Sequence, residues 1–326
     1  MLCIFHESTD PYFNIATDEF ILKHLKEDCF MLWRNDNAII IGKYQNALAE
    51  INYDYVKANN IHVVRRISGG GAVYHDLGNL NFSFTKQGEN MSLMDFEGYT
   101  KPIVDVLQSM GVSAKFEGRN DLMIDGLKIS GNAEHIYRNK ILHHGTLLFS
   151  SQMKNVGEAL KTHPLKFQDK AVKSIPKRVT NISDHLPTPI SIEEFTKKIM
   201  DHVVATFSDC RYYEFTAEDI AAIEKLKQEK YITDEWNYGL VADYNFQKAV
   251  KTPGGILEIH MEVQKGIIEK IKIFGDFFNL RDLEEIEKAL IKSKHEEAAL
   301  RNTLSQFKIE EYFHSISIDD IISAMF

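Results

Sequence analysis

Residues 66–75 of the chain are Arg66-Ile67-Ser68-Gly69-Gly70-Gly71-Ala72-Val73-Tyr74-His75. Three consecutive glycines allow the backbone to approach another group closely, and successive amides there can form a concave site for an anion. The residues after the glycines are typical of a strand, so the stretch fits neither the Walker nor the Rossmann phosphate-binding pattern. It predicts a turn that binds phosphate or carboxylate. A tight bend between two strands, without a ligand, is the alternative.

Strands are predicted on both sides of this turn. In 79–85, Leu80, Phe82 and Phe84 alternate with Asn, Ser and Thr, which predicts a strand with one core face and one polar face. Asp125-Gly126 joins two short apolar runs and is typical of a two-residue hairpin, which would present Lys128. Further strands are expected at 30–33, 38–41, 62–64, 112–116, 121–124, 127–129, 141–149, 256–263 and 267–274.

Helix-capping residues mark the predicted helices. Asp10-Pro11 combines a capping residue with proline at the first helical position, and Ser191 with Glu194 forms a capping box. Gly111 suits the left-handed end of a helix. Helices are expected from residue 11 and at 94–110, 191–208, 216–231, 280–291, 304–313 and 318–325. The order of elements predicts an α+β fold: a large mixed-sheet domain at 1–244 and a smaller α+β domain at 245–326.

Composition limits the classes of function. The 326 residues carry 38 Lys and Arg against 47 Asp and Glu, a net charge of −9, which argues against a protein that binds nucleic acid non-specifically. Cys3, Cys29 and Cys210 are widely spaced and odd in number, which favours a reducing compartment. Because neither a signal peptide nor a run of about 18 apolar residues is present, we expect a cytoplasmic protein with no membrane or nucleic-acid partner.

A family resemblance is carried by three motifs. The stretch 65–84 closely resembles the signature of lipoate-protein ligases, 118–133 resembles the second signature of that family, and 143–148 resembles the third. Shorter matches follow at 173–174, 178–182 and 275–278, so the resemblance spans nearly the whole chain. It implies the catalytic fold of biotin and lipoate ligases with the C-terminal accessory domain of the bacterial enzymes.

The resemblance implies an ATP-dependent ligation of lipoate to a protein lysine through lipoyl-AMP. It makes Lys128 the catalytic residue, contacting both the lipoyl carboxyl group and the α-phosphate. Without the resemblance, Lys128 would be an ordinary exposed hairpin lysine. ATP and Mg2+ are the expected substrate and activator, with no tightly bound cofactor. The expected partners are lipoate and either apo-lipoyl domains of 2-oxoacid dehydrogenase E2 subunits or the glycine cleavage H protein.

The resemblance also implies two sets of binding residues. The nucleotide would be bound by Arg66, Gly71, Ala72, Val73, Tyr74, Asn120, Asp121 and Lys128. Lipoate would be bound by Trp33, Ser68, Gly69, Gly70, His75, Lys128 and His144.

Asp121 could hold Mg2+, with a turn-capping role equally open. Trp33 could be ordinary core, and His143 and His144, which point to opposite faces of a predicted strand, could both be structural histidines.

Two other functions remain open. One is cysteine-independent lipoyl or octanoyl transfer, because transferases usually pass the acyl group through a cysteine thioester, whereas the three cysteines lie outside the motifs. The other is a non-catalytic lipoyl-binding protein. In addition, the basic stretch 166–178 predicts a segment that covers the adenylate and attracts an acidic carrier domain, with Lys170, Lys173 and Lys177 contributing.

Overall fold

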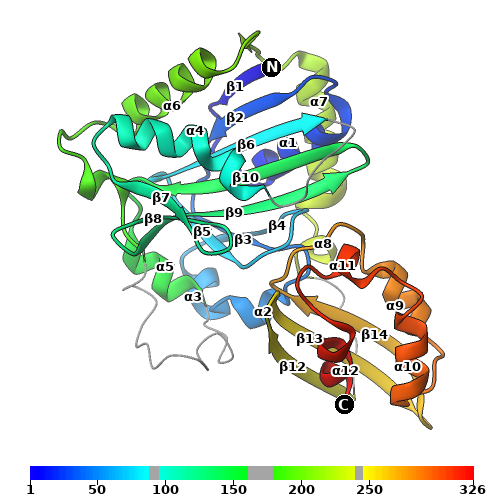
Figure 1. Cartoon of the computed structure of the whole chain (residues 1–326). Helices are drawn as coiled ribbons and strands as arrows, with labels where there is room; N and C mark the ends of the chain where they lie inside the picture. The colour runs from blue at the N-terminus through cyan, green and yellow to red at the C-terminus, as the bar shows by residue number, and fades with distance from the viewer. Residues whose placement is uncertain (88–94, 161–178, 239–244) are drawn as a thin grey trace.

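The computed structural model describes residues 1–87, 95–160, 179–238 and 245–326. Figure 1 shows a large unit built on a twisted sheet and a small C-terminal unit with a sheet of its own, which confirms the expected α+β class. The basic stretch 166–178 lies outside the described residues, which resume at Val179.

The strands of the large unit are β1 (Leu2–His6), β2 (Cys29–Trp33), β3 (Ala38–Ile41), β4 (His62–Arg65), β5 (Val73–His75), β6 (Asn79–Gln87), β7 (Ala114–Glu117), β8 (Asp121–Ile124), β9 (Leu127–Tyr137), β10 (Lys140–Leu148) and β11 (Arg211–Tyr212). Its helices are α1 (Pro11–His24), α2 (Ala47–Glu50), α3 (Tyr53–Ala58), α4 (Phe96–Ser109), α5 (Met153–Ala159), the 3-10 helix η3 (Ile182–His185), α6 (Ile192–Thr206), α7 (Ala217–Leu226), the π-helical turn η4 (Lys227–Tyr231) and α8 (Asp234–Tyr238).

The main sheet has the strand order β11-β1-β2-β6-β10-β9-β8-β7 within the described residues. The strands β11, β1 and β2 are parallel, and every later neighbour is antiparallel. The expected mixed sheet is therefore confirmed. The strand β1 was not predicted, because its five residues alternate too little to mark a strand.

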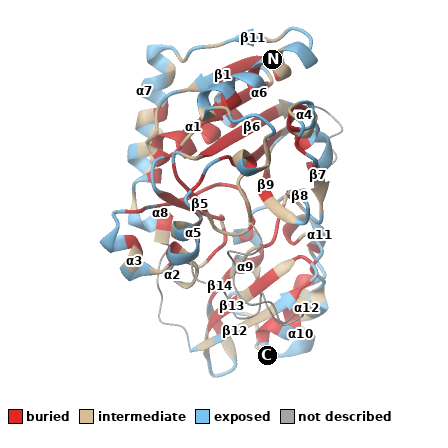
Figure 2. Ribbon diagram, turned by 90° about the vertical axis from the view of Figure 1, so that its left-hand side faces the viewer, coloured by how far each residue is buried: buried red, intermediate tan, exposed pale blue. Residues whose placement is uncertain are grey.

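Both faces of the main sheet are covered by helices. Helices α4 and α6 pack on one face around Phe30, Phe82 and Phe84, and helix α1 packs on the other against Met31 and Trp33. Figure 2 shows that most of the length of the central strands is buried. The prediction that β6 is half-buried was therefore wrong: its polar residues Asn79, Asn81, Ser83 and Thr85 are as buried as its phenylalanines, since α1 covers them.

The capping predictions agree with the structure. The Asp10 side chain accepts hydrogen bonds from the amides of Tyr12 and Phe13, which starts α1 at Pro11. Ser191 and Glu194 form the expected capping box of α6. Gly111 follows α4 with a φ of 84°. These local devices fix where the helices that cover the sheet begin and end.

The glycine stretch joins two strands of a second, smaller sheet. The strand order in this sheet is β4-β3-β5, with β4 parallel and β5 antiparallel to β3. Strand β4 ends at Arg65 and β5 begins at Val73, so residues 66–72 form the predicted turn between strands. We refer to residues 66–72 as the glycine loop.

The hairpin between β8 and β9 forms at the predicted residues. Asp125 and Gly126 have φ values of 49° and 77°, the left-handed conformation that a two-residue turn requires. The turn places Lys128 near the start of β9, which extends to Tyr137 rather than ending at Ile129 as expected.

The C-terminal unit consists of β12 (Phe246–Thr252), β13 (Gly255–Gln264), β14 (Ile267–Gly275), α9 (Glu284–Leu290), α10 (Glu297–Leu304), α11 (Ile309–Tyr312) and α12 (Ile318–Met325). Its three strands form an antiparallel sheet covered by the helices. The predicted helix 304–313 was wrong: the chain instead forms α10 up to Leu304 and the short α11. Helix α9 begins four residues later than predicted, because the amides of Leu280 and Arg281 donate to the Glu311 carbonyl and the Asp282 side chain pairs with Lys43 of the large unit.

Gly126→Ala should destabilise the protein. No atom lies within 4 Å of an added Cβ at Gly126, so the penalty comes from its φ of 77° alone. The expected loss in the free energy of unfolding is about 1–2 kcal/mol, measured by urea denaturation. Asp125→Gly is the control: it alters the same turn but relieves left-handed strain, so a comparable loss there would contradict the explanation.

Candidate active site

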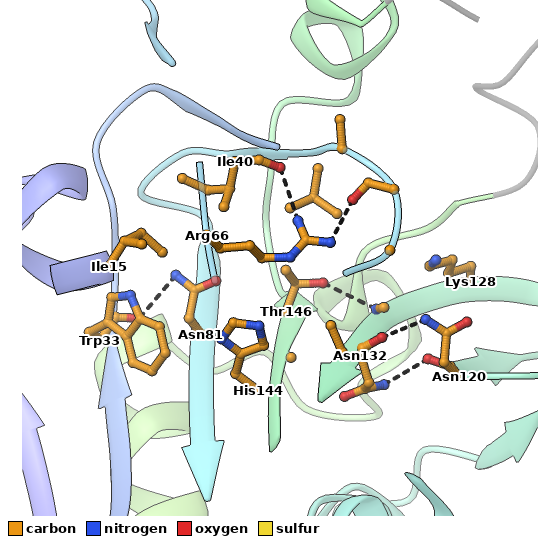
Figure 3. A pocket seen from close by; sticks show the side chains of 17 residues that line it. Ile15, Trp33, Ile40, Arg66, Asn81, Asn120, Lys128, Asn132, His144 and Thr146 are labelled. Atoms are coloured by element: carbon orange, nitrogen blue, oxygen red, sulfur yellow. Dashed lines mark hydrogen bonds between the residues drawn. The ribbon is translucent and has the colours of Figure 1, made fainter. Parts of the chain in front are cut away.

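A single pocket brings together the glycine loop, the Lys128 hairpin and the strand that carries His144. It encloses about 590 Å³ of space, part of it open to solvent, which suits a small-molecule ligand. Figure 3 shows Trp33 and Lys128 at opposite ends of the pocket, with Arg66 and Thr146 between them. The lining residues are Ile15, Trp33, Ile40, Arg66, Gly70, Gly71, Ala72, Val73, Asn81, Asn120, Lys128, Gly131, Asn132, Ala133, His144, Gly145 and Thr146.

The Arg66 guanidinium holds the glycine loop in shape. Its Nη2 donates to the carbonyls of Gly69 at 2.6 Å and Gly71 at 2.9 Å, and its Nη1 donates to the Ile40 carbonyl at 3.2 Å. Its Nε donates to the Ser68 hydroxyl at 3.0 Å. Burial lowers the pKa of Arg66 to about 10, which still leaves it charged at neutral pH. These four bonds leave one of the five guanidinium protons for a ligand.

Lys128 lies at the mouth of the pocket. Its Nζ is 2.7 Å from Oδ1 of Asp121, and both side chains are about one-third exposed. The lysine stem crosses Gly131, where a Cβ would lie only 2.9 Å from Nζ. An ion pair this exposed is weak and exchangeable, so a ligand anion can replace Asp121 as the partner of Lys128.

Nine of the predicted residues line the pocket. They are Trp33, Arg66, Gly70, Gly71, Ala72, Val73, Asn120, Lys128 and His144.

The other predicted residues lie behind the pocket wall or beside its mouth. Gly69 packs against the C-terminal unit, and the Tyr74 hydroxyl points away and donates to Asn37. His75 is buried with its Nδ1 3.0 Å from the Asn35 amide nitrogen. Burial lowers the pKa of His75 to about 3, with smaller contributions from Arg66 and His144, so the ring is neutral. Asp121 contacts Lys128.

Ser68 lies behind the pocket in contact with His144. Its Oγ is 2.6 Å from Nε2 of His144, and Nδ1 of His144 is 2.8 Å from Oδ2 of Asp18. His143 points to the opposite face, where its Nδ1 is 3.0 Å from Glu134. Both histidines are buried, because helices cover both faces of β10.

Sequence reasoning missed several lining residues. Asn81, Gly131, Asn132, Ala133, Gly145 and Thr146 belong to the quoted motifs but received no role, and Ile15 and Ile40 gave no signal beyond being apolar. Asn132 and Asn120 are tied together, since the Asn132 side chain donates to the Asn120 carbonyl at 3.0 Å. This link joins β9 to the residue that precedes β8.

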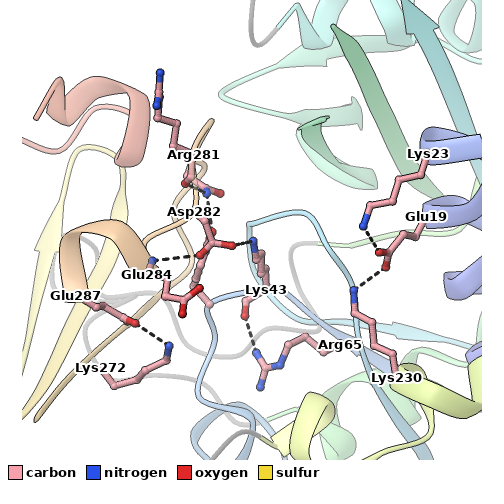
Figure 4. A network of polar contacts seen from close by, with 12 residues as sticks. Glu19, Lys23, Lys43, Arg65, Lys230, Lys272, Arg281, Asp282, Glu284 and Glu287 are labelled. Carbon is pink, nitrogen blue, oxygen red and sulfur yellow. Dashed lines mark hydrogen bonds and ion pairs between the residues drawn. The ribbon is translucent and has the colours of Figure 1, made fainter. Parts of the chain in front are cut away.

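The C-terminal unit touches the glycine loop directly. The Gly70 amide donates to the Phe277 carbonyl at 3.3 Å, and the Phe278 ring lies against Phe96 at 5.3 Å between centroids. Nearby, Lys43 and Asp282 form an ion pair of 2.7 Å between the units, which Figure 4 shows. The conformation of the loop therefore depends on a contact more than 200 residues away along the chain.

No three His, Cys, Asp or Glu side chains in the described ranges gather closely enough to hold a metal ion. No helix in those ranges is both long and apolar enough to cross a membrane.

Two known protein-family models match the chain. Residues 10–204 match the lipoyl protein ligase A/B catalytic domain, and residues 242–325 match the bacterial lipoate protein ligase C-terminus. This chain belongs to the lipoate-protein ligase family. Lipoate-protein ligase 1 of Staphylococcus aureus, a relative, is 44% identical over 319 residues, which are 97% of each chain.

Solved structures share the fold of this family member. Plasmodium falciparum LipL1 in complex with lipoate covers 99% of this chain and 98% of its own, with a TM-score of 0.79 and 24% identity. A bipartite lipoate protein ligase studied with its E2 lipoyl domain, from Thermoplasma acidophilum, covers 75% and 98% with a TM-score of 0.67 and 31% identity. A lipoate-protein ligase A bound with ATP covers 74% and 99% with a TM-score of 0.65 and 28% identity.

Gly69→Ala should weaken the contact between the glycine loop and the C-terminal unit. The added Cβ would lie 2.4 Å from the Phe277 carbonyl oxygen, so one backbone must move. We expect a loss of about 1–3 kcal/mol in the free energy of unfolding, as for other overpacked sites. Gly71→Ala is the matched control, because no atom lies within 4 Å of its Cβ. Equal stability of the two variants would contradict the contact.

Proposed function

We propose that this ligase activates lipoate with ATP as lipoyl-AMP and then transfers the lipoyl group to a lysine of an acceptor protein. The observation that carries the proposal is the pocket between the glycine loop and Lys128, which offers amides and two cations to an anion beside a partly apolar cavity. The ATP-bound and lipoate-bound relatives support the choice of ligands.

The first step joins the two substrates. A lipoate carboxylate oxygen attacks the α-phosphorus of ATP, the bond from that phosphorus to the bridging oxygen breaks, and pyrophosphate leaves. Negative charge on the α-phosphate increases during the attack, so fixed cations accelerate the step more than a protein nucleophile would. Lys128 leaves Asp121 to contact both the carboxylate and the α-phosphate, which holds the reacting groups together.

Arg66 and the amides of Gly71 and Ala72 are proposed to contact the nucleotide. The apolar end of the pocket, with Trp33 and Ile15, is proposed to take the acyl chain. Because Ser68, Gly69, Tyr74 and His75 lie behind the lining or turn away from it, we propose that they shape the pocket wall.

Asn120 and Asp121 would hold the Mg2+ that accompanies ATP. Asp121 and Asn120 stand together at the mouth, and Mg2+ that carries ATP phosphates needs only one or two protein oxygens. Among the described residues, the Asp121 carboxylate is held by its exchangeable ion pair with Lys128 alone and is about one-third exposed, which fits that requirement. We therefore propose that Asp121 takes Mg2+ or ribose when Lys128 turns to the substrates.

In the second step, the neutral amine of the acceptor lysine attacks the lipoyl carbonyl carbon. The bond to the AMP oxygen breaks, AMP leaves, and the amine loses a proton to solvent. The Thermoplasma relative, studied with its E2 lipoyl domain, supports a lipoyl domain as the acceptor. The glycine cleavage H protein is a second proposed acceptor.

The positions of the cysteines favour the ligase over a transferase. Cys3 and Cys29 are buried in the sheet, and none of the three cysteines lines the pocket. Burial raises the pKa of Cys29 to about 12, which disfavours a nucleophilic thiolate.

Lys128→Ala should abolish lipoyl-AMP formation. Mass spectrometry of a mixture of protein, ATP, Mg2+ and lipoate should show the adenylate for the wild type, and then acylation of an added lipoyl domain. Lys115→Ala is the matched control, since Lys115 is an exposed lysine on β7, the strand on the far side of β8 from Lys128, and is paired with Glu117 at 2.9 Å. Wild-type adenylate formation by Lys128→Ala would refute the assignment, and acyl transfer without ATP would favour the transferase.

We also propose a domain boundary at residues 244 and 245, with the C-terminal unit needed mainly for adenylation. A chain ending at residue 244 lacks Phe277 and therefore loses a contact of the glycine loop. It should transfer the lipoyl group from preformed lipoyl-AMP better than it performs the overall reaction. Circular dichroism should first show that the truncated chain is folded. Equal losses of transfer and of the overall reaction would then refute the proposal that the C-terminal unit is needed mainly for adenylation.

A further inference from the structure

A chain of buried hydrogen bonds runs behind the pocket from helix α1 to the glycine loop. Oδ2 of Asp18 contacts Nδ1 of His144 at 2.8 Å, Nε2 of His144 contacts Oγ of Ser68 at 2.6 Å, and Nε of Arg66 donates to the same Oγ at 3.0 Å. Asp18 and Ser68 are at most 1% exposed, and Arg66 and His144 at most 7%. Among these residues, Asp18 alone has no role in the site so far.

The direction of each hydrogen bond follows from the chemistry of its ends. An arginine Nε can only donate and an ionised carboxylate can only accept. Ser68 therefore accepts from Arg66 and gives its own proton to Nε2 of His144, and the ring gives its Nδ1 proton to Asp18. A cationic ring would instead donate to Ser68 and leave the serine proton without an acceptor among the described residues.

The same three residue types form nucleophilic triads in hydrolases, but this serine cannot act in that way. Ser68 is fully buried, is absent from the residues that line the pocket, and its oxygen already accepts a bond from a cation. The hydrogen-bond geometry indicates that Ser68 orients Arg66 and His144 and does not attack a substrate.

We propose that Asp18 is a positioning residue for adenylation. It fixes His144 as the Nδ1–H tautomer, so that Ser68 presents a lone pair to Arg66, and Arg66 then holds the carbonyls of Gly69 and Gly71. The carboxylate on α1 thereby sets the shape of the loop that meets the nucleotide. The inference rests on the proposed function for its kinetic consequence, and on the hydrogen-bond geometry alone for the tautomer.

Substitution of Asp18 should allow the His144 ring to adopt the other neutral tautomer. An asparagine can donate to Nδ1 as well as accept from it, and an alanine offers no acceptor at all. In both variants the ring can move its proton to Nε2 and donate to Ser68. Ser68 would then receive two donors and have no acceptor for its own proton, which weakens its bond to Arg66.

The first test is the tautomer of His144, read by 15N NMR of histidine-labelled, ligand-free protein and assigned by the loss of its resonance in His144→Gln. We expect the Nδ1–H form in the wild type and an increased Nε2–H population in Asp18→Asn and Asp18→Ala. A wild-type ring in the Nε2–H or cationic form, or a tautomer that both variants leave unchanged, would overturn the proposal.

The second test is the rate of lipoyl-AMP formation. We expect a fall of about ten- to a hundredfold in Asp18→Asn, as for other residues that orient a functional group through a hydrogen bond. Glu19→Gln is the matched control: it also removes a buried carboxylate charge from α1, but Glu19 pairs with Lys23 at 2.5 Å and Lys230 at 2.6 Å and makes none of the hydrogen bonds that link Asp18 to Arg66 (Figure 4).

The outcomes distinguish failure of the positioning role of Asp18 from failure of the proposed function. A changed tautomer with an unchanged rate in Asp18→Asn, or an equal fall in Glu19→Gln at matched thermal stability, would overturn the positioning role. A folded wild type that makes no adenylate would instead contradict the proposed function, while the tautomer result would still test the hydrogen-bond chain.

Discussion

The Arg66 guanidinium lies beneath the glycine loop, and its acceptors are carbonyls and one hydroxyl. Within the part of the chain that the structure describes, no carboxylate forms an ion pair with it, so its positive charge is not neutralised locally. Burying such a charge is costly, as the lowered pKa of Arg66 indicates, and the four hydrogen bonds offset part of that cost. What remains is a positive charge beside the backbone of the glycine loop, which suits the binding of an anion.

Lys128 differs from Arg66 in both exposure and partner. It stands at the pocket mouth and is paired with Asp121, so its charge is available only when an anion or metal ion competes for that pair. The site thus combines a fixed cation that shapes the loop with an exchangeable cation that can follow the reacting groups. One fixed and one exchangeable cation suit the proposed reaction, in which the lipoate carboxyl group is a nucleophile in the first step and an electrophile in the second.

Local patterns predicted those parts of the site that local residues determine. The turn chemistry of Asp125-Gly126 correctly placed Lys128 on a hairpin, and the glycine run between apolar stretches predicted a turn between strands. The burial of the polar face of β6 could not be predicted, because it depends on α1 packing across the sheet. The contact of Gly69 with Phe277 was equally hidden, since no pattern links residues so far apart in sequence.

One pocket is proposed to perform a reversible adenylation of lipoate. Exchange of labelled pyrophosphate into ATP, measured without any acceptor protein, tests this most directly. We predict that the exchange of pyrophosphate into ATP requires both lipoate and Mg2+. Absence of exchange in folded protein, or exchange that proceeds equally well without lipoate, would contradict it.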